Sequence, residues 1–120
     1  PHTLPDTVNV SLSFANGSIG VISYFSNGDK SLPKERLELY SHGSVAVLDD
    51  FKSLTIHAAG RTTRKKLVRQ DKGQANQVAL FITALLKGSE PLISFEELYS
   101  ASLTTFKVME SLRSGNSVGI

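Results

Sequence analysis

The amino-acid sequence predicts an α+β domain, in which a mostly antiparallel open sheet of about six strands is followed by two helices packed on one face of the sheet. Two observations carry this prediction. Through the first half of the chain, apolar residues alternate with polar ones between short turn signals, which is typical of an antiparallel meander. In the second half, apolar residues recur every three or four positions, as they do along one face of a helix.

The first two strands are predicted on either side of Asn16-Gly17. Residues 8–14 alternate strictly between apolar and polar side chains, and residues 19–25 form a second apolar run. Asn-Gly between two such runs favours a hairpin, because both turn positions tolerate a positive φ. In the second run both alternating sets contain large apolar residues, so the sheet face away from the helices needs a partner. We therefore expect a homodimer or higher homo-oligomer through this sheet face.

Four further strands are expected after a polar loop that spans residues 27–34. The alternating or apolar segments are 35–41, 44–48, 54–58 and 61–69. Turn signals at His42-Gly43, Asp49-Asp50 and Ala59-Gly60 separate them. Connections this short join neighbouring antiparallel strands.

Two helices are expected in the second half. The first has one apolar stripe at the spacing i, i+3, i+4, i+7 and i+8, formed by Val78, Phe81, Ile82, Leu85 and Leu86. Asp71 is placed to cap its start and Gly88 to end it. The second helix begins with a capping box between Ser94 and Glu97 and ends at Gly115.

Composition excludes several functional classes. The chain of 120 residues has no cysteine, which excludes disulfide scaffolds, thiolate zinc sites and cysteine nucleophiles. No apolar run approaches the ~20 residues of a membrane span, and no segment resembles a signal peptide, so we expect a cytoplasmic protein without a membrane partner. The chain begins with Pro1, and its only methionine is Met109. We therefore expect a processed or excised piece of a longer protein, folded as a single domain over residues 1–120.

The densest charge feature is a run of cations on the last predicted strand, formed by Arg61, Arg64, Lys65, Lys66 and Arg69. Such a run could contact phosphates. However, no aromatic residue interleaves with it to stack on bases, and the net charge of the chain is only +2. A charged edge strand that resists edge-to-edge pairing explains the run better than a nucleic-acid surface does.

Other common sites are not predicted. The three histidines, His2, His42 and His57, lie far apart in sequence, and none has a partner at i+4, so we expect no metal site. No Gly-x-Ser-x-Gly elbow is present, and no Gly-x-Gly-x-x-Gly loop opens a helix. The best local candidate is the loop 27–35, in which a lysine could hold a substrate hydroxyl or carboxylate. From the residues alone, an ordinary solvated loop remains the better explanation.

The same loop carries a resemblance to a known family. Asn-Gly-Asp-Lys-Ser-Leu-Pro-Lys-Glu-Arg-Leu-Glu (27–38), followed by Gly-Ser-Val-Ala-Val-Leu-Asp-Asp-Phe (43–51), resembles the C-terminal domain of the Gfo/Idh/MocA oxidoreductases, the glucose–fructose oxidoreductase and inositol dehydrogenase family. Three further stretches agree, namely 6–20, 70–73 and 110–118. The resemblance spans nearly the whole chain, and the shared order of the motifs is its strongest part.

The resemblance implies a parent enzyme with an N-terminal Rossmann domain that binds NAD or NADP and exchanges a hydride with a sugar, cyclitol or related hydroxy compound. The C-terminal domain would supply part of the substrate pocket and the oligomer interface. Lys30 is the first candidate for substrate contact in the parent, followed by Asp29 and Lys34. No catalytic residue carries over to this chain. Related members often have histidine at the position of Gln74, and glutamine is no proton shuttle near neutral pH.

We therefore expect this chain alone to bind no cofactor and to be inactive. The alternative is a stand-alone interaction domain that dimerises and has no catalytic role. A strand followed by a Gly-x-Gly-x-x-Gly loop upstream of Pro1 would favour the dehydrogenase, and its absence would favour the interaction domain.

Overall fold

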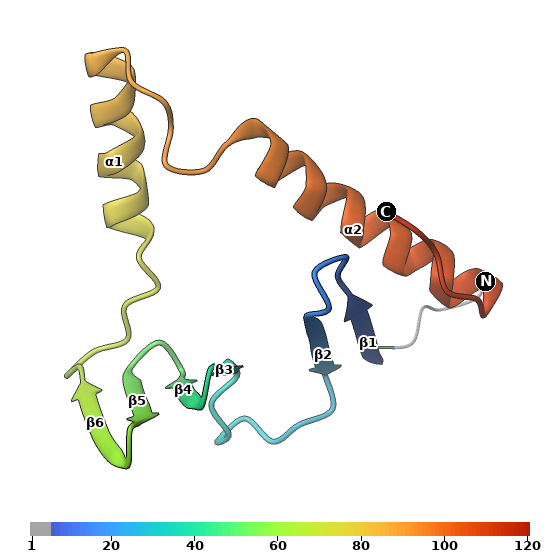
Figure 1. Cartoon of the computed structure of the whole chain (residues 1–120), viewed down its shortest axis with the longest axis horizontal. Helices are drawn as coiled ribbons and strands as arrows, with labels where there is room; N and C mark the ends of the chain where they lie inside the picture. The colour runs from blue at the N-terminus through green and yellow to red at the C-terminus, as the bar shows by residue number, and fades with distance from the viewer. Residues whose placement is uncertain (1–5) are drawn as a thin grey trace. The chain divides into compact units, whose positions relative to one another are not determined.

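The structure is a computed structural model that describes residues 6–120, and it confirms the α+β class (Figure 1). Six antiparallel strands precede two helices. The elements are β1 (Thr7–Ser13), β2 (Ile19–Phe25), β3 (Arg36–Ser41), β4 (Ser44–Asp49), β5 (Ser53–Ala58), β6 (Arg61–Lys66), α1 (Gln74–Lys87) and α2 (Phe95–Ser114). The strands form two sheets, β1-β2 and β3-β4-β5-β6, and β2 does not pair with β3.

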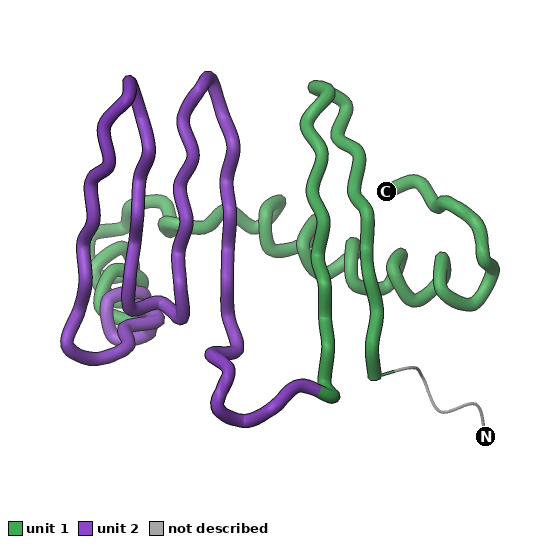
Figure 2. The backbone as a smooth tube through the Cα atoms, turned by 90° about the horizontal axis from the view of Figure 1, so that it is seen from below, with its two compact units in different colours: residues 1–27, 78–120 green, residues 28–77 purple. Residues whose placement is uncertain are grey.

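The chain divides into two compact units, which Figure 2 shows in two colours. One unit comprises residues 1–27 and 78–120 and contains the β1-β2 hairpin, residues 78–87 of α1 and all of α2. The other comprises residues 28–77 and contains the four-stranded sheet. The chain therefore crosses between the units twice, once in the loop before β3 and once in the first turn of α1.

The predicted hairpin at Asn16-Gly17 is confirmed, but only Gly17 has a positive φ, of 82°. The Gly17 amide donates to the Phe14 carbonyl at 2.9 Å, and the Phe14 amide donates to the Ser18 carbonyl at 2.9 Å. The Asn16 side-chain oxygen accepts from the Ser18 amide at 3.0 Å. The connection is thus a turn that ends in a left-handed glycine, a common three-residue hairpin loop.

The three turns of the four-stranded sheet share one conformation. Each has two consecutive residues with positive φ, at His42-Gly43, Asp50-Phe51 and Ala59-Gly60. Paired positive φ values are those of type I′ turns, whose twist matches that of the flanking strands. The middle turn is unusual because neither residue is glycine, and Phe51 has a φ of 51°.

Register gives the four-stranded sheet two different faces. Leu37, Leu48 and Leu54 are neighbours across three strands, and Leu39, Ala46 and Ile56 form the next row on the same face. We call these six residues the apolar face. The opposite face carries polar or charged groups on every strand, among them Arg36, Glu38, Thr55, His57 and Arg64. The expectation of apolar residues on both faces holds for β2, where Val21, Ile22, Tyr24 and Phe25 are all exposed.

Helix α2 has the predicted ends. The Ser94 hydroxyl accepts from the Glu97 amide at 3.1 Å, and the Glu97 carboxylate accepts from the Ser94 amide at 2.9 Å. Gly115 closes the helix in the left-handed conformation, and its amide donates to the Ser111 carbonyl at 2.8 Å. A helix needs such capping because its first amides and last carbonyls have no partner within the helix.

Helix α1 ends at Gly88 as predicted, but its start differs from the prediction. Asp71 does not cap the helix. Its carboxylate accepts from the Gly73 amide at 2.8 Å, which forms a tight turn before the helix. The Gly73 carbonyl accepts from the Gln77 amide at 2.8 Å and so takes the capping position. The aspartate lies two residues before the capping position, and its carboxylate is used in this turn.

Little of the apolar surface is enclosed within the described residues. Ala84 is the one buried apolar residue among them, and Thr55 is the one buried polar residue. Large side chains on the apolar face, such as Leu37 and Leu39, are more than half exposed. No helix in residues 6–120 is long and apolar enough to cross a membrane.

Replacing Ser94 by alanine removes the acceptor for the Glu97 amide. We expect the free energy of unfolding to fall by about 1 kcal/mol, because an N-cap hydroxyl typically contributes that much. Urea unfolding followed by circular dichroism measures this loss. Ser100→Ala in the same helix is the control, because the Ser100 hydroxyl makes no hydrogen bond in the described part of the chain. An equal loss in both variants would contradict the capping role.

Candidate functional site

The loop before β3 contains all three predicted substrate contacts. Asp29 is used within the loop, because its Oδ1 accepts from the Ser31 amide at 2.8 Å and from the Ser31 hydroxyl at 2.6 Å. These hydrogen bonds hold the pKa of Asp29 below its ordinary value. The Asp29 carbonyl also accepts from the Leu32 amide at 3.1 Å. Asp29 therefore forms the turn through its Oδ1 atom and its carbonyl, and these hydrogen bonds do not use Oδ2.

Lys30 and Lys34 are free in the same loop. Neither side chain makes a hydrogen bond or an ion pair within residues 6–120, and both residues are exposed. Free ammonium groups can donate to a hydroxyl or pair with an anion. Of the three predicted residues, the two lysines thus remain available for a ligand.

The end of this loop is fixed by an ion pair. The Lys72 ammonium group donates to Oε1 of Glu35, although the two residues are 37 positions apart in sequence. The same ammonium group lies 5.8 Å from the centre of the Phe51 ring, within the range of a cation–π contact. Both partners of the ion pair are about one third exposed, so the pair is only partly screened by water.

The turn between β4 and β5 lies at the centre of these contacts. The Asp50 amide donates to the Glu35 carbonyl at 2.7 Å, which extends the β3–β4 ladder to the end of the loop. The Gln70 side-chain amide donates to the Asp50 carboxylate at 2.8 Å and to its carbonyl at 3.0 Å. The Asp71 amide donates to the Phe51 carbonyl at 3.1 Å. These hydrogen bonds from Gln70 and Asp71 therefore hold the segment that follows β6 against the turn.

We call Glu35, Asp50, Phe51, Gln70 and Lys72 the clasp. It joins the segment that enters the four-stranded sheet to the segment that leaves it, at one end of that sheet. The sequence pointed to the acidic turn and to residues 70–73 separately, but it did not pair them. An acidic residue before one strand and a lysine after another give no local signal of contact, because only the sheet topology brings them together.

The clasp changes the acidity of one of its members. The pKa of Glu35 lies below its ordinary value of 4.5, mainly because Lys72 donates to the carboxylate, while Lys34 adds a smaller electrostatic contribution. Folding therefore favours the ionised carboxylate. Its contribution to stability is present at neutral pH and is lost as the pH falls through the folded pKa.

A second charge network lies on the polar face of the sheet at β3. Arg36 donates to Glu38 at 2.8 Å and to Asp49 at 2.9 Å. The Tyr40 hydroxyl donates to Glu38 at 2.8 Å, and this bond is the main reason that the pKa of Glu38 lies below its ordinary value. All four side chains have partners, so the network is a structural one. Exposed pairs of this kind contribute little to stability individually.

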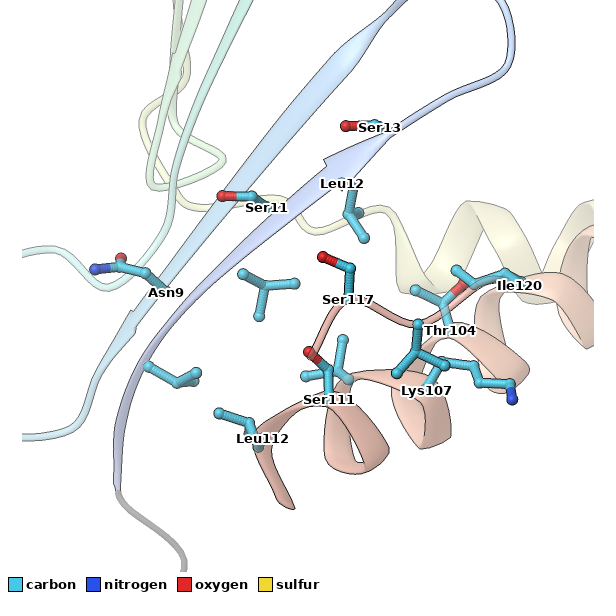
Figure 3. Close-up of a pocket in the computed structure, with 14 residues that line it drawn as sticks. Asn9, Ser11, Leu12, Ser13, Thr104, Lys107, Ser111, Leu112, Ser117 and Ile120 are labelled. Carbon is cyan, nitrogen blue, oxygen red and sulfur yellow. The ribbon is translucent and has the colours of Figure 1, made fainter. Parts of the chain in front are cut away.

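A groove of about 260 Å³ lies between β1 and α2 in the unit that contains the hairpin (Figure 3). Figure 3 shows Leu12 pointing toward the helix side of the groove, whereas Ser11 points to the other side of the strand. The polar groups of the helix are already engaged. Ser111 donates to the Asn116 carbonyl at 2.7 Å, and Lys107 pairs with Glu110 at 3.0 Å. The lining also includes Asn9 and Ser117, whose side chains make no hydrogen bond within residues 6–120, so the groove is partly polar.

The remaining predicted features lie apart from the clasp. His57 Nδ1 is within 3.0 Å of the Thr62 hydroxyl, and His42 Nδ1 is within 2.7 Å of the Ser41 hydroxyl. His2 lies outside the described residues. No group of three or more histidine, aspartate or glutamate residues that could hold a metal ion occurs in residues 6–120.

Comparison with protein-family models, with functionally characterised proteins and with solved structures finds no match to this chain.

Replacing Lys72 by methionine removes the donor to Glu35 and keeps most of the apolar side chain. We expect the pKa of Glu35 to rise toward 4.5, because the main cause of its depression is gone. Titration of the Glu35 side-chain carboxyl by NMR measures this change. Stability should also depend less on pH in the acid range, where the unmodified chain loses the ion pair.

The matched control is Lys34→Met, which removes the neighbouring charge but no hydrogen bond. A smaller rise of the Glu35 pKa is expected there. An equal rise in both variants would show that general charge, and not the clasp contact, sets this pKa.

Proposed function

We propose that this chain is the substrate-side and assembly domain of an NAD(P)-dependent oxidoreductase that acts on a sugar, a cyclitol or a related hydroxy compound. The clasp is the observation that carries the proposal. The resemblance to the Gfo/Idh/MocA family rests on segments 27–38, 43–51 and 70–73, which are separated in sequence. Each contributes residues to the clasp. Motifs matched only by their order along the chain thus lie together in one unit, which supports the proposal that they form one functional region.

The cofactor would be held by a Rossmann domain elsewhere in the same protein. Within residues 6–120 the glycines with positive φ lie in hairpin turns, at the ends of helices or just before α1. None belongs to a Gly-x-Gly-x-x-Gly loop that could cradle a pyrophosphate. When bound, the nicotinamide would supply the hydride acceptor or donor. We assign no proton-transfer step to this chain, whose contribution is to shape and line the pocket.

The loop lysines are the proposed contacts with substrate. A polyhydroxy compound offers many acceptors, and a lysine ammonium group offers three donors. Lys30 is one residue from Asp29, whose turn fixes the backbone there, and Lys34 adjoins Glu35 of the clasp. The loop is thus tied at both ends while its cations remain free. Such a loop can position a donor without a large loss of entropy on binding.

The apolar face supports the assembly role. Leu37 and Leu39 are 61% and 62% exposed, and Ile56 lies in the same row as Leu39, with Ala46 between them. A contiguous apolar surface of this kind marks an interaction site more often than a free surface. The same observation favours the second candidate function, a stand-alone domain that dimerises through its sheet without catalysis.

The longer protein that contains this chain decides between the two candidates. The dehydrogenase proposal requires a strand, a Gly-x-Gly-x-x-Gly loop and a helix upstream of Pro1, and reduction of NAD or NADP by a sugar or cyclitol. Replacing Lys30 by alanine in that protein should raise KM or lower kcat while cofactor affinity stays the same. Steady-state kinetics and a cofactor titration measure these quantities.

Lys65→Ala is the matched control for the kinetic test, because it removes the same charge from β6 instead of the loop. Unchanged kinetics in Lys30→Ala and Lys34→Ala would leave the loop with a structural role only. A longer protein without a dinucleotide-binding motif would favour the interaction domain.

Assembly through the apolar face can be tested on the chain alone. Leu39→Lys places a charge on this face, so we expect sedimentation to show a lower fraction of oligomer. Tyr40→Lys is the control, because Tyr40 is the next residue of β3, is 69% exposed and lies on the opposite face. Disruption by Tyr40→Lys alone would assign the interface to the polar face.

A further inference from the structure

Strand β6 carries the strongest unpaired charge in the four-stranded sheet. Its six residues are all exposed, and four of them are cations: Arg61, Arg64, Lys65 and Lys66. Because β6 is the last strand in the order β3-β4-β5-β6, one of its backbone edges has no ladder partner among residues 6–120 (Figure 1). An open edge of this kind is a ready template for another strand.

The neighbouring strand offers no charge to neutralise these cations. Their partners on β5 are small, apolar or neutral, since Arg61 faces Ala58, Arg64 faces Thr55, Lys65 faces Leu54 and Lys66 faces Ser53. The opposite edge of the sheet is different, because Arg36 on β3 faces Asp49 and pairs with it at 2.9 Å. Within the described residues, none of the four β6 cations forms an ion pair.

The charges of β6 are also distributed over both faces of the sheet, so an added strand would meet cations on each face. Successive side chains of a strand point to opposite faces of the sheet. Arg64 and Lys66 therefore lie on the polar face, and Arg61 and Lys65 lie on the apolar face. Arg64 is held by a long contact, 3.4 Å from its Nε to the Thr55 hydroxyl, and its remaining donors are free.

A second copy of β6 is a poor partner for this edge. Antiparallel pairing centred between Thr63 and Arg64 would place Arg61 opposite Lys66, and in-register parallel pairing would place each cation beside its own copy. Like charges directly opposite one another destabilise a strand pair. The same arrangement would attract a strand with acidic side chains.

We propose that the open edge of β6 binds an acidic, extended polypeptide segment by strand addition. The backbone of the segment would complete the ladder, and its carboxylates would pair with the four cations on the two faces. A nucleic acid fits less well, because residues 61–69 contain no aromatic side chain on which bases could stack. The inference is independent of the proposed dehydrogenase function.

A synthetic peptide with the repeating sequence Glu-Glu-Val-Val is the probe, because this pattern places glutamates on both faces of a strand. Its binding to the full chain is measured by fluorescence anisotropy at low salt. The comparison peptide has the same side chains, but all of its backbone amides are N-methylated, so it keeps the charge and has no amide donor with which to complete a ladder on either edge. We expect the first peptide to bind and the methylated one to bind at least roughly tenfold more weakly, because its ladder hydrogen bonds are lost.

The charge contribution is tested with Arg64→Gln/Lys66→Gln, which should weaken binding of the first peptide roughly threefold to tenfold. Lys87→Gln/Arg113→Gln is the matched control, because it removes two cations from the helices and should change binding little. Circular dichroism checks that both variants fold. The peptide comparison uses the unaltered chain and therefore does not depend on either variant.

Three outcomes would overturn the proposal. Equal binding of the two peptides would reduce the edge to a general electrostatic surface. Absence of binding at low salt would remove the site altogether. Tighter binding of an oligothymidylate of equal charge, with a steep dependence on salt, would assign the cations to nucleic acid instead.

Discussion

The turn between β4 and β5 is the constraint on which the described sheet and its loops depend. Asp50 and Phe51 both have positive φ, a conformation that costs free energy in residues other than glycine. The surrounding contacts offset this cost. The turn receives the end of the loop through Glu35 and the exit from β6 through Gln70 and Asp71. One short turn therefore fixes where the chain enters and leaves the four-stranded sheet.

Charge is distributed unevenly around this sheet, although the net charge of the chain is only +2. Arg36 at one edge is paired with Glu38 and Asp49, and Lys72 at the clasp is paired with Glu35. The cations of β6 have no acidic neighbour across the strand. Paired charges are already neutralised within the sheet, and unpaired charges are free to act on another molecule. The net charge adds paired and unpaired charges together and therefore does not show this difference.

The surfaces of this unit have separate roles in our proposals. The loop lysines would face a small polyhydroxy substrate, the apolar face would meet a second copy, and the open edge of β6 would take an acidic segment. Arg61 and Lys65 of β6 lie on the same side of the sheet as the apolar face, so the acidic segment and a second copy would be neighbours there. The chain would provide shape and recognition, while the hydride chemistry would take place at a cofactor held by another domain.

The sequence by itself determined the elements of this protein. Alternation and helical spacing are local properties, so they located the six strands and two helices, and the Ser94 capping box and the Gly88 and Gly115 ends followed from neighbouring residues. The start of α1 was missed because the turn-forming use of Asp71 competes with capping over the same few residues.

Only the tertiary structure decided which distant residues meet. Lys72 and Glu35 are 37 positions apart, and their contact depends on the sheet order between them. The division into two sheets also follows from pairing, which local patterns do not specify. Likewise, the sequence showed a run of cations, but cross-strand register decided that Arg64 faces Thr55 and not a carboxylate. A contact between two distant segments does not change the residue pattern within either segment. Neither segment alone therefore predicts the contact.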